Sequence, residues 1–221
     1  MKNFLIAPSR LFLAFEYAVL FLLTPALLYL HPTRLNVHGT LWLVTAYAAA
    51  ILHHTPGFSW RMAWQGNPLT SRDFKLIAVR FVLSTIGIVF LTTLLQPDRL
   101  LSFPLQRPGF WLIVMLLYPL LSALPQELVF RSFFFHRYQA LFPHKAAMLA
   151  ATAFVFGFIH IVFHNPVSPL LSLVCGFFIG GSYFAHRSLK RAALEHALYG
   201  DMVFTVGLGL YFLVGSLPVI R

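Results

Sequence analysis

The sequence is poor in charge and nearly free of cysteine. Only 10% of its 221 residues are charged and just 6 are acidic, whereas 59% are hydrophobic. With a mean hydropathy of +0.78, this composition excludes an ordinary soluble globular protein. We therefore expect an integral membrane protein with an all-α fold, and a single membrane domain over residues 1–221.

The other absences exclude several kinds of site. Cys175 is the only cysteine, so the chain has no intrachain disulfide and no CxxC metal or redox site. The HExxH spacing of many zinc enzymes is absent, and so are internal repeats, which argues against a transporter built from repeats. Cys175 lies in an apolar run, where it is most simply a packing residue.

Long apolar runs are what the chain has in abundance. A helix of about 20 residues crosses the hydrocarbon layer, and the runs predict a bundle of seven to eight such helices. Pro119 and Pro125 interrupt the fourth run, which is either one kinked helix or two helices with the second starting at Pro125. The expected spans are 11–30, 38–54, 76–96, 109–135, 145–164, 167–186 and 192–215.

The net charge of +10 comes from Lys and Arg at the ends of these runs, which indicates membrane anchoring rather than nucleic-acid binding. Cytoplasmic loops carry the excess of such residues, so we expect an inner-membrane protein with a cytoplasmic N-terminus and a retained first span. Arg80 falls within a span. The expected cytoplasmic side holds Lys2, Arg10, Arg61, Arg72, Lys75, Arg131, Arg137, Lys145, Arg187, Lys190 and Arg191, and the other side holds Arg34, Arg99, Arg107 and Arg221.

Small residues recur every four positions in the sixth expected span, at Ser172, Gly176 and Gly180. This spacing allows close approach of two membrane helices. We expect these residues to face the interior of the same molecule rather than a second copy.

Ionisable side chains inside three of the apolar runs suggest one buried polar site, because such groups are costly at membrane depth. Glu127 and Arg131 are four residues apart and can pair on one helical face, either as a structural ion pair or as part of a site. His160 and His164 also share a face, with His164 close to the membrane surface. His160 could be a hydrogen-bonded interior histidine or a group for acid–base catalysis.

The third group follows a basic stretch. Glu195 either balances Lys190 or Arg191, or belongs to the site with the adjacent His196. Asp201 lies deeper and needs a partner, such as His196 or Arg131.

The order of these motifs, (E/Q)ExxxR, then FxxxH, then a later histidine, resembles that of the CPBP family of intramembrane proteases. This family includes type II CAAX prenyl endopeptidases and bacteriocin-processing or immunity proteins. The resemblance covers about residues 108–210, the expected catalytic core.

The resemblance implies a role for each matching residue. The family's first motif contains two glutamates, and the first of them usually activates water. In this chain the two positions are Gln126 and Glu127, and the matching arginine is Arg131. His160 would help to bind or deprotonate the water, and His196 would stabilise the oxyanion. Many members have Asn or Asp four residues after that histidine, where this chain has Gly200 and then Asp201.

The chain departs from the family at Gln126, because an amide cannot accept a proton. Glu127 would then have to take the base role, with Gln126 orienting water or the scissile carbonyl. Glu127, His160 and His196 could also form a two-histidine, one-carboxylate zinc site. We expect no obligatory cofactor, with zinc as the alternative.

The sequence thus predicts an endopeptidase for a membrane-associated or hydrophobic peptide, using Glu127, His160, His196, Gln126, Arg131 and Asp201. The expected partners are the bilayer and this substrate. The alternatives are a non-catalytic scaffold, immunity or assembly factor on the same fold, and a transporter or haem-binding protein.

Overall fold

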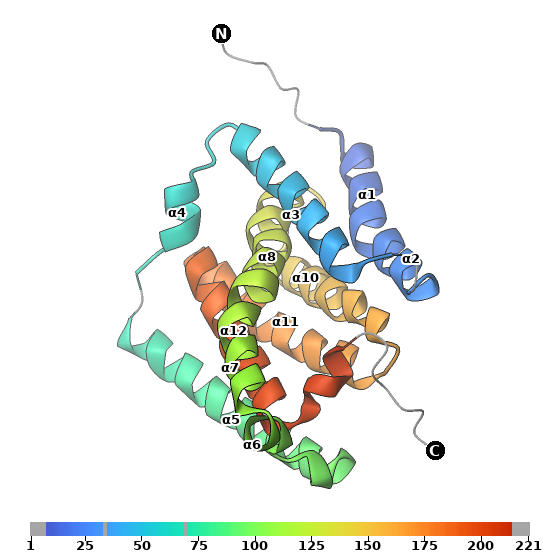
Figure 1. Cartoon of the computed structure of the whole chain (residues 1–221). Coiled ribbons are helices and arrows are strands. Elements are labelled where there is room, and N and C mark those ends of the chain that lie inside the picture. The colour runs from blue at the N-terminus through green and yellow to red at the C-terminus, as the bar shows by residue number, and fades with distance from the viewer. Residues whose placement is uncertain (1–7, 33–34, 69, 214–221) are drawn as a thin grey trace.

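The computed structural model describes residues 8–32, 35–68 and 70–213, and every regular element in these ranges is helical (Figure 1). The expected all-α membrane bundle is confirmed. Its N-terminal part contains α1 (Arg10–Ala18), continued by η1 (Val19–Leu23) and α2 (Thr24–Leu30), then α3 (Val37–His54), the short α4 (Trp60–Gln65) and α5 (Ser71–Leu95).

The fourth apolar run is one continuous helix of 30 residues, Pro108–Arg137, so the second helix considered at Pro125 does not separate from it. A proline has no amide hydrogen to donate, and wide π turns beginning at Pro119 and Leu128 let the helix continue. After η2 (Pro97–Arg99) and α6 (Ser102–Gln106), its segments are α7 (Pro108–Tyr118), η3 (Pro119–Ala123), α8 (Leu124–Glu127), η4 (Leu128–Phe133) and α9 (Phe134–Arg137).

The C-terminal part forms three helices in sequence. The last one stops at Val206, earlier than expected, because Gly207 turns the chain with a φ of +121°; residues 214 and 215 of the expected span lie outside the described ranges. The elements are α10 (Lys145–Ile159), η5 (His160–Phe163), α11 (Val167–His186), α12 (Leu189–Val206) and η6 (Leu208–Phe212).

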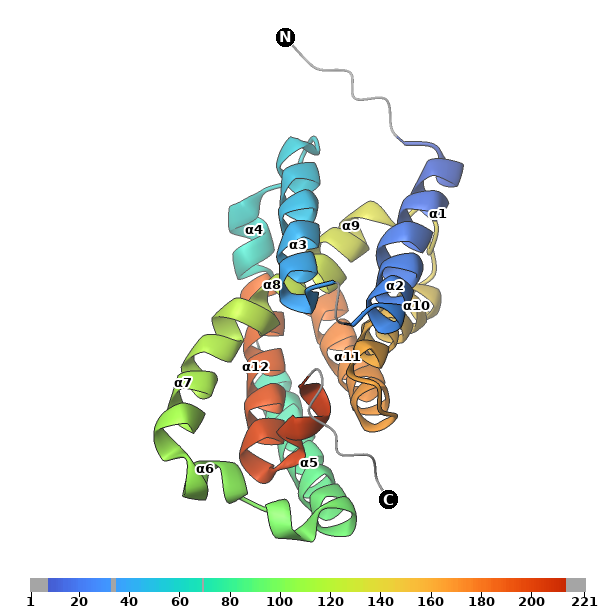
Figure 2. The same ribbon diagram turned by 45° about the vertical axis from the view of Figure 1, so that its right-hand side comes forward.

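Among the described residues, five helices are long and apolar enough to cross a membrane, rather than the seven expected. The two others, α3 and α12, are 18 residues long but do not reach the same apolar character, and α12 carries four charged residues. Even so, α12 contacts both α4 and α6, which lie at opposite ends of the molecule (Figure 2). The five spans are Arg10–Leu30, Ser71–Leu95, Pro108–Arg137, Lys145–Phe163 and Val167–His186.

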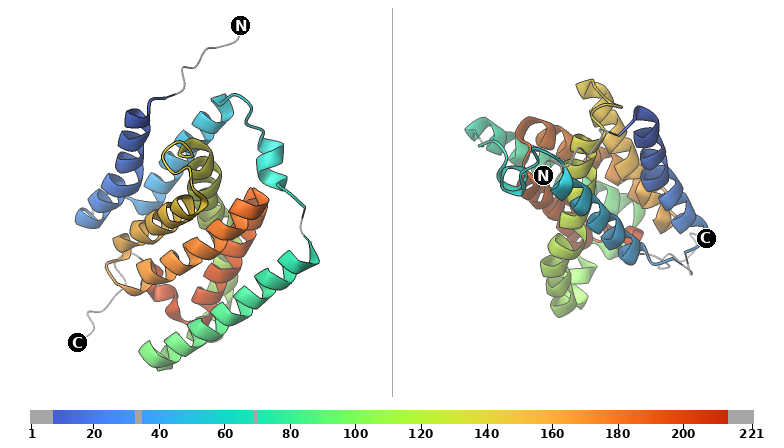
Figure 3. Two further views of the ribbon diagram at one scale, coloured as in Figure 1. Left: turned by 180° about the vertical axis from the view of Figure 1, so that it is seen from behind. Right: turned by 90° about the horizontal axis from the view of Figure 1, so that it is seen from above.

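Seen from behind, α10, α11 and α12 lie between the α1–α2 helix on one side and α5 on the other (Figure 3). Ser172, Gly176 and Gly180 are buried in α11, and Gly176 packs against Ala153 of α10. The expected interior, intramolecular face of this helix is confirmed. Close packing of α10 on α11 fixes the end of α10, where His160 lies.

Charged residues at the helix ends agree only in part with the expected distribution. Arg131, counted as a cytoplasmic anchor, is instead buried in the bundle with 0% exposure, because it pairs with Glu127. Lys2, Arg34 and Arg221 lie outside the described residues.

Candidate functional site

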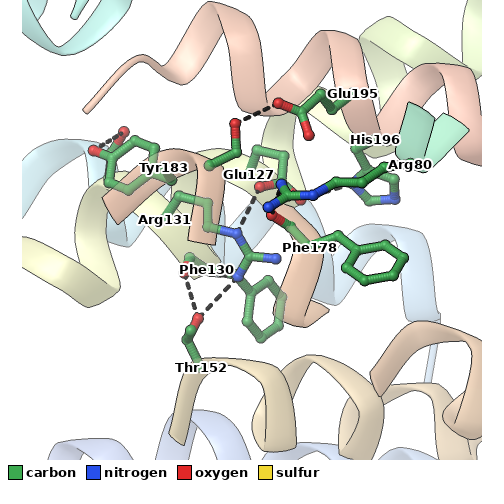
Figure 4. A network of polar contacts seen from close by, with 11 residues as sticks. Arg80, Glu127, Phe130, Arg131, Thr152, Phe178, Tyr183, Glu195 and His196 are labelled. Carbon is green, nitrogen blue, oxygen red and sulfur yellow. Dashed lines mark hydrogen bonds and ion pairs between the residues drawn. The ribbon is translucent and has the colours of Figure 1, made fainter. Parts of the chain in front are cut away.

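The centre of the bundle holds one buried carboxylate with a partner on each oxygen. Glu127 lies in α8 and has 0% of its surface exposed. Its Oε2 is 3.0 Å from Nε of Arg131, one helical turn later, as the spacing predicts (Figure 4). Its Oε1 is 2.9 Å from Nδ1 of His196 on α12. The Glu127–Arg131 pair and His196, which the sequence analysis found in separate apolar runs, are therefore in direct contact.

Arg131 connects this carboxylate to α10. Its Nη1 donates to Oγ1 of Thr152 at 2.9 Å and to the carbonyl of Phe130 at 3.2 Å (Figure 4). Thr152 donates in turn to the same carbonyl at 2.8 Å, and the guanidinium lies 5.1 Å from the centroid of the Phe156 ring. These contacts hold Glu127 in one position.

His196 is fixed by its carboxylate and by two aromatic rings. The rings of Phe156 and Tyr118 lie at 5.3 and 6.0 Å, each nearly perpendicular to the imidazole. A carboxylate only accepts, so Nδ1 of His196 donates to Glu127 and carries a proton. The remaining nitrogen, Nε2, is the one available for chemistry.

His160 is oriented in the same way by a different acceptor. Its Nδ1 lies 2.6 Å from the carbonyl oxygen of Phe156, which can only accept, so this nitrogen is also the protonated one. In the neutral ring, Nε2 therefore carries a lone pair. His164 does not join the site: it is exposed, with a φ of 56°, and stacks on Tyr29 at 4.3 Å.

Gln126 points away from its neighbour Glu127. Its Nε2 donates to Oγ of Ser122 at 2.8 Å. Its Oε1 is buried and has no hydrogen-bond partner among the described residues. This orphaned acceptor suits a water molecule or a substrate amide.

Gln126, His160 and His196 line one cavity of about 1070 Å³ among α5, α7, α11 and α12. The wall is mostly apolar, and no Asp or Glu in the described part of the chain lines it. Gln126 and His160 also line a small neighbouring cavity of about 60 Å³. Glu127 lies behind His196 rather than on the cavity wall.

Glu195 and Asp201, the acidic residues on either side of His196, do not line this cavity. Glu195 is buried and accepts from Ser182 of α11, so its partner is not the Lys190 or Arg191 considered from the sequence (Figure 4). Asp201 has a buried Oδ1 without a hydrogen-bond partner in the described ranges. Neither expected partner reaches it, since His196 and Arg131 are both directed to Glu127.

The zinc alternative does not fit this arrangement. Oε1 of Glu127 is hydrogen-bonded to Nδ1 of His196, and Oε2 lies 3.0 Å from Nε of Arg131, so both oxygens of the carboxylate are already paired. Within the described ranges, no three His, Cys, Asp or Glu side chains converge as metal ligands. The carboxylate needed for a two-histidine, one-carboxylate site is thus committed elsewhere.

Sequence reasoning missed Tyr118, Ser122 and Thr152. Tyr118, Ser122 and Gln126 are spaced four residues apart on one helix, and all three line the large cavity. Polar residues at positions i, i+4 and i+8 of an otherwise apolar helix share one face, so this pattern could have been recognised in the sequence. Thr152 gave no such signal, because only the packing of α10 on η4 brings it to Arg131.

Comparison with known proteins supports the order of motifs. Residues 108–200 match the model of a family described as Rce1-like, type II CAAX prenyl endopeptidase. No curated protein and no solved structure matches the chain. The matched segment runs from α7 into α12 and contains all three motifs up to His196, and the resemblance drawn from them is confirmed.

Proposed function

We propose that the chain hydrolyses a hydrophobic peptide at the wall of the large cavity, because residues 108–200 match the model of a family of type II CAAX prenyl endopeptidases. One observation carries this proposal. His160 and His196 line the same cavity, and each ring has Nδ1 engaged by an acceptor, which leaves Nε2 for the reaction.

His160 and Gln126 hold the attacking water in this proposal. The lone pair on Nε2 of His160 and the free Oε1 of Gln126 are both acceptors, and a water molecule has two protons to donate. A water bound in this way directs its own lone pair at the peptide carbonyl. His160 takes one proton as the water attacks and returns it to the leaving amine when the C–N bond breaks.

His196 stabilises the negative oxygen that develops on the carbonyl. To donate from Nε2 while Nδ1 donates to Glu127, the ring carries two protons and a positive charge. The Glu127 carboxylate compensates that charge, and Arg131 keeps the carboxylate in place. Glu127 is therefore a positioning residue for His196, in contrast to the base role expected from the sequence.

The substrate in this proposal is a membrane-associated peptide or protein that enters the apolar cavity from the bilayer. A prenylated C-terminal segment is the version that the family's name suggests. The proposed location is the inner membrane with a cytoplasmic N-terminus. No nucleic acid takes part.

A cleavage assay in lipid nanodiscs tests the assignment, with a fluorogenic prenylated CAAX peptide and its unprenylated counterpart. We expect His160→Ala and His196→Ala each to lower kcat by about 100-fold or more. His164→Ala is the matched control, because His164 is an exposed histidine only four residues from His160. If both site variants cut at the wild-type rate, the assignment is wrong.

A non-catalytic scaffold on the same fold is the second candidate, and the absence of a carboxylate from the described cavity wall favours it. Gln126→Glu distinguishes the two, because it places a carboxylate beside His160. If the natural protein is inactive and Gln126→Glu alone gives it cleavage activity, the result would support the scaffold function for the natural protein. An active parent would exclude it.

A further inference from the structure

Tyr118, at the end of α7, fills the position next to His196 where a side chain of residue 200 would lie. Gly200 is one turn after His196 on α12. A Cβ added to Gly200 would overlap the ring and the hydroxyl oxygen of Tyr118. The glycine therefore allows a phenol from another helix to occupy this place.

The surroundings of the ring orient it against the imidazole. Its contacts with His196 and Phe204, at centroid distances of 6.0 and 5.3 Å, are both edge contacts. Of the two rings that touch His196, Phe156 and Tyr118, only Tyr118 carries a hydroxyl. Tyr118 also lines the large cavity, together with Gln126, His160 and His196.

A phenol can donate a hydrogen bond without carrying a charge, which suits an apolar cavity. We propose that Tyr118 is a further catalytic residue, whose hydroxyl donates beside Nε2 of His196 to the oxyanion of the tetrahedral intermediate. This inference rests on the proposed peptidase function. The two donors come from different helices, α7 and α12, so the oxyanion site forms between them.

Tyr118→Phe tests the role because it removes only the hydroxyl and keeps the ring against Gly200. We expect kcat to fall by about 100-fold with little change in KM, since the hydrogen bond acts on the transition state. Tyr17→Phe is the control for loss of a phenol, because Tyr17 packs in the aromatic core away from both cavities. Equal kcat values for Tyr118→Phe and the parent would overturn the proposal.

A binding measurement tests the same role without turnover. The probe is a prenylated peptide with a phosphinate in place of the scissile amide, compared with the uncleaved amide peptide bound to His160→Ala. The phosphinate is anionic and tetrahedral, as the intermediate is. In the His160→Ala background, we expect Tyr118→Phe to weaken phosphinate binding at least 10-fold more than amide binding.

The outcomes of this measurement separate the two proposals. If the chain has no peptidase activity but still prefers the phosphinate in a way that depends on Tyr118, the oxyanion site is retained and the proposed function is rejected. A preference that Tyr118→Phe leaves unchanged rejects the role of Tyr118 alone. Failure of the phosphinate to bind better than the amide in the His160→Ala parent rejects both.

A paired exchange distinguishes a donor from a packing residue. Tyr118→Ala opens the space above Gly200, and Gly200→Asn then has room to place an amide donor beside His196. We expect the double variant to regain at least 10-fold of the phosphinate affinity lost in Tyr118→Ala. No regain, with an unchanged thermal midpoint, would contradict a donor at this position.

Discussion

Gln126 and Glu127 are adjacent in sequence but lie in different surroundings. Consecutive residues on a helix point about 100° apart, so one faces the cavity while the other faces His196 and Arg131. The base role expected for Glu127 depended on its being the acidic member of the pair. The contacts support a positioning role instead, because both carboxylate oxygens already have partners and neither faces the cavity.

The Glu127–Arg131 pair makes a prediction about stability. Arg131→Met leaves a buried carboxylate with only His196 as its partner, and we expect it to lower the free energy of unfolding by about 3–5 kcal/mol. Replacing both residues, as Glu127→Gln with Arg131→Met, should cost less than the sum of the two single changes. Unfolding curves in detergent measure these values.

An additive double variant would contradict direct pairing of these two side chains. His164→Ala serves again as a neutral control for this measurement. Its exposed ring stacks on Tyr29 near the surface, so its removal should change the free energy of unfolding by no more than about 0.5 kcal/mol.

At the scale of elements, the site depends on how closely the helix from α7 to α8 approaches α10 and α12. The π turns keep α7, η3 and α8 continuous past two prolines, which aligns Tyr118, Ser122 and Gln126 along the cavity. The contact between α10 and α11 places His160 at the same cavity. Neither arrangement follows from hydropathy, because apolar runs fix the length of a helix but not its rotation.

Gly176 tests the contact between α10 and α11. A Cβ at this position would lie 3.0 Å from Cα of Ala153, so Gly176→Leu should force the helices apart. We expect a loss of about 1–3 kcal/mol in the free energy of unfolding and a lower cleavage rate, since His160 moves with α10. Thermal unfolding and the cleavage assay together measure both effects.

Gly181 provides the matched control on the same helix. An added Cβ there meets nothing within 4 Å, so Gly181→Ala should be neutral or stabilise by up to about 1 kcal/mol through helix propensity. If Gly176→Leu were as well tolerated as this control, close packing of α10 on α11 would not be what positions His160.

At the scale of the whole molecule, the main prediction concerns the orientation of the bundle in the membrane. The helix order places α4 and α6 at opposite ends (Figure 2), and from the charge distribution we propose that the α4 end faces the cytoplasm. Arg131 no longer counts toward that excess, but the remaining basic residues keep the same sign of bias.

Single cysteines can test this orientation, because Cys175 is the only native cysteine and can be replaced by Ser. In that background, we expect Gln65→Cys to react with an impermeant maleimide only from the cytoplasmic side. Asp98→Cys should react only from the other side. Both positions are exposed. Labelling of both from one side, or the reverse pattern, would reject the assigned orientation.

The sequence by itself determined the membrane-bundle class, the positions of most helices and the resemblance to the CPBP family, because hydropathy, helical spacing and motif order are local properties of the chain. It also predicted the Glu127–Arg131 pair, since residues four apart share a helical face. The number of membrane spans was overestimated from the sequence, because α12 carries four charged residues and does not count with the five apolar helices.

Tertiary structure decided which of these polar groups can meet a substrate. The packing of α12 on α8 turned Nδ1 of His196 to Glu127, and the cavity then exposed Gln126, His160 and Tyr118 rather than the carboxylate. These relations join residues up to about 80 positions apart, such as Tyr118 and Gly200. Local periodicity sets the face of a helix, but only packing decides what that face meets.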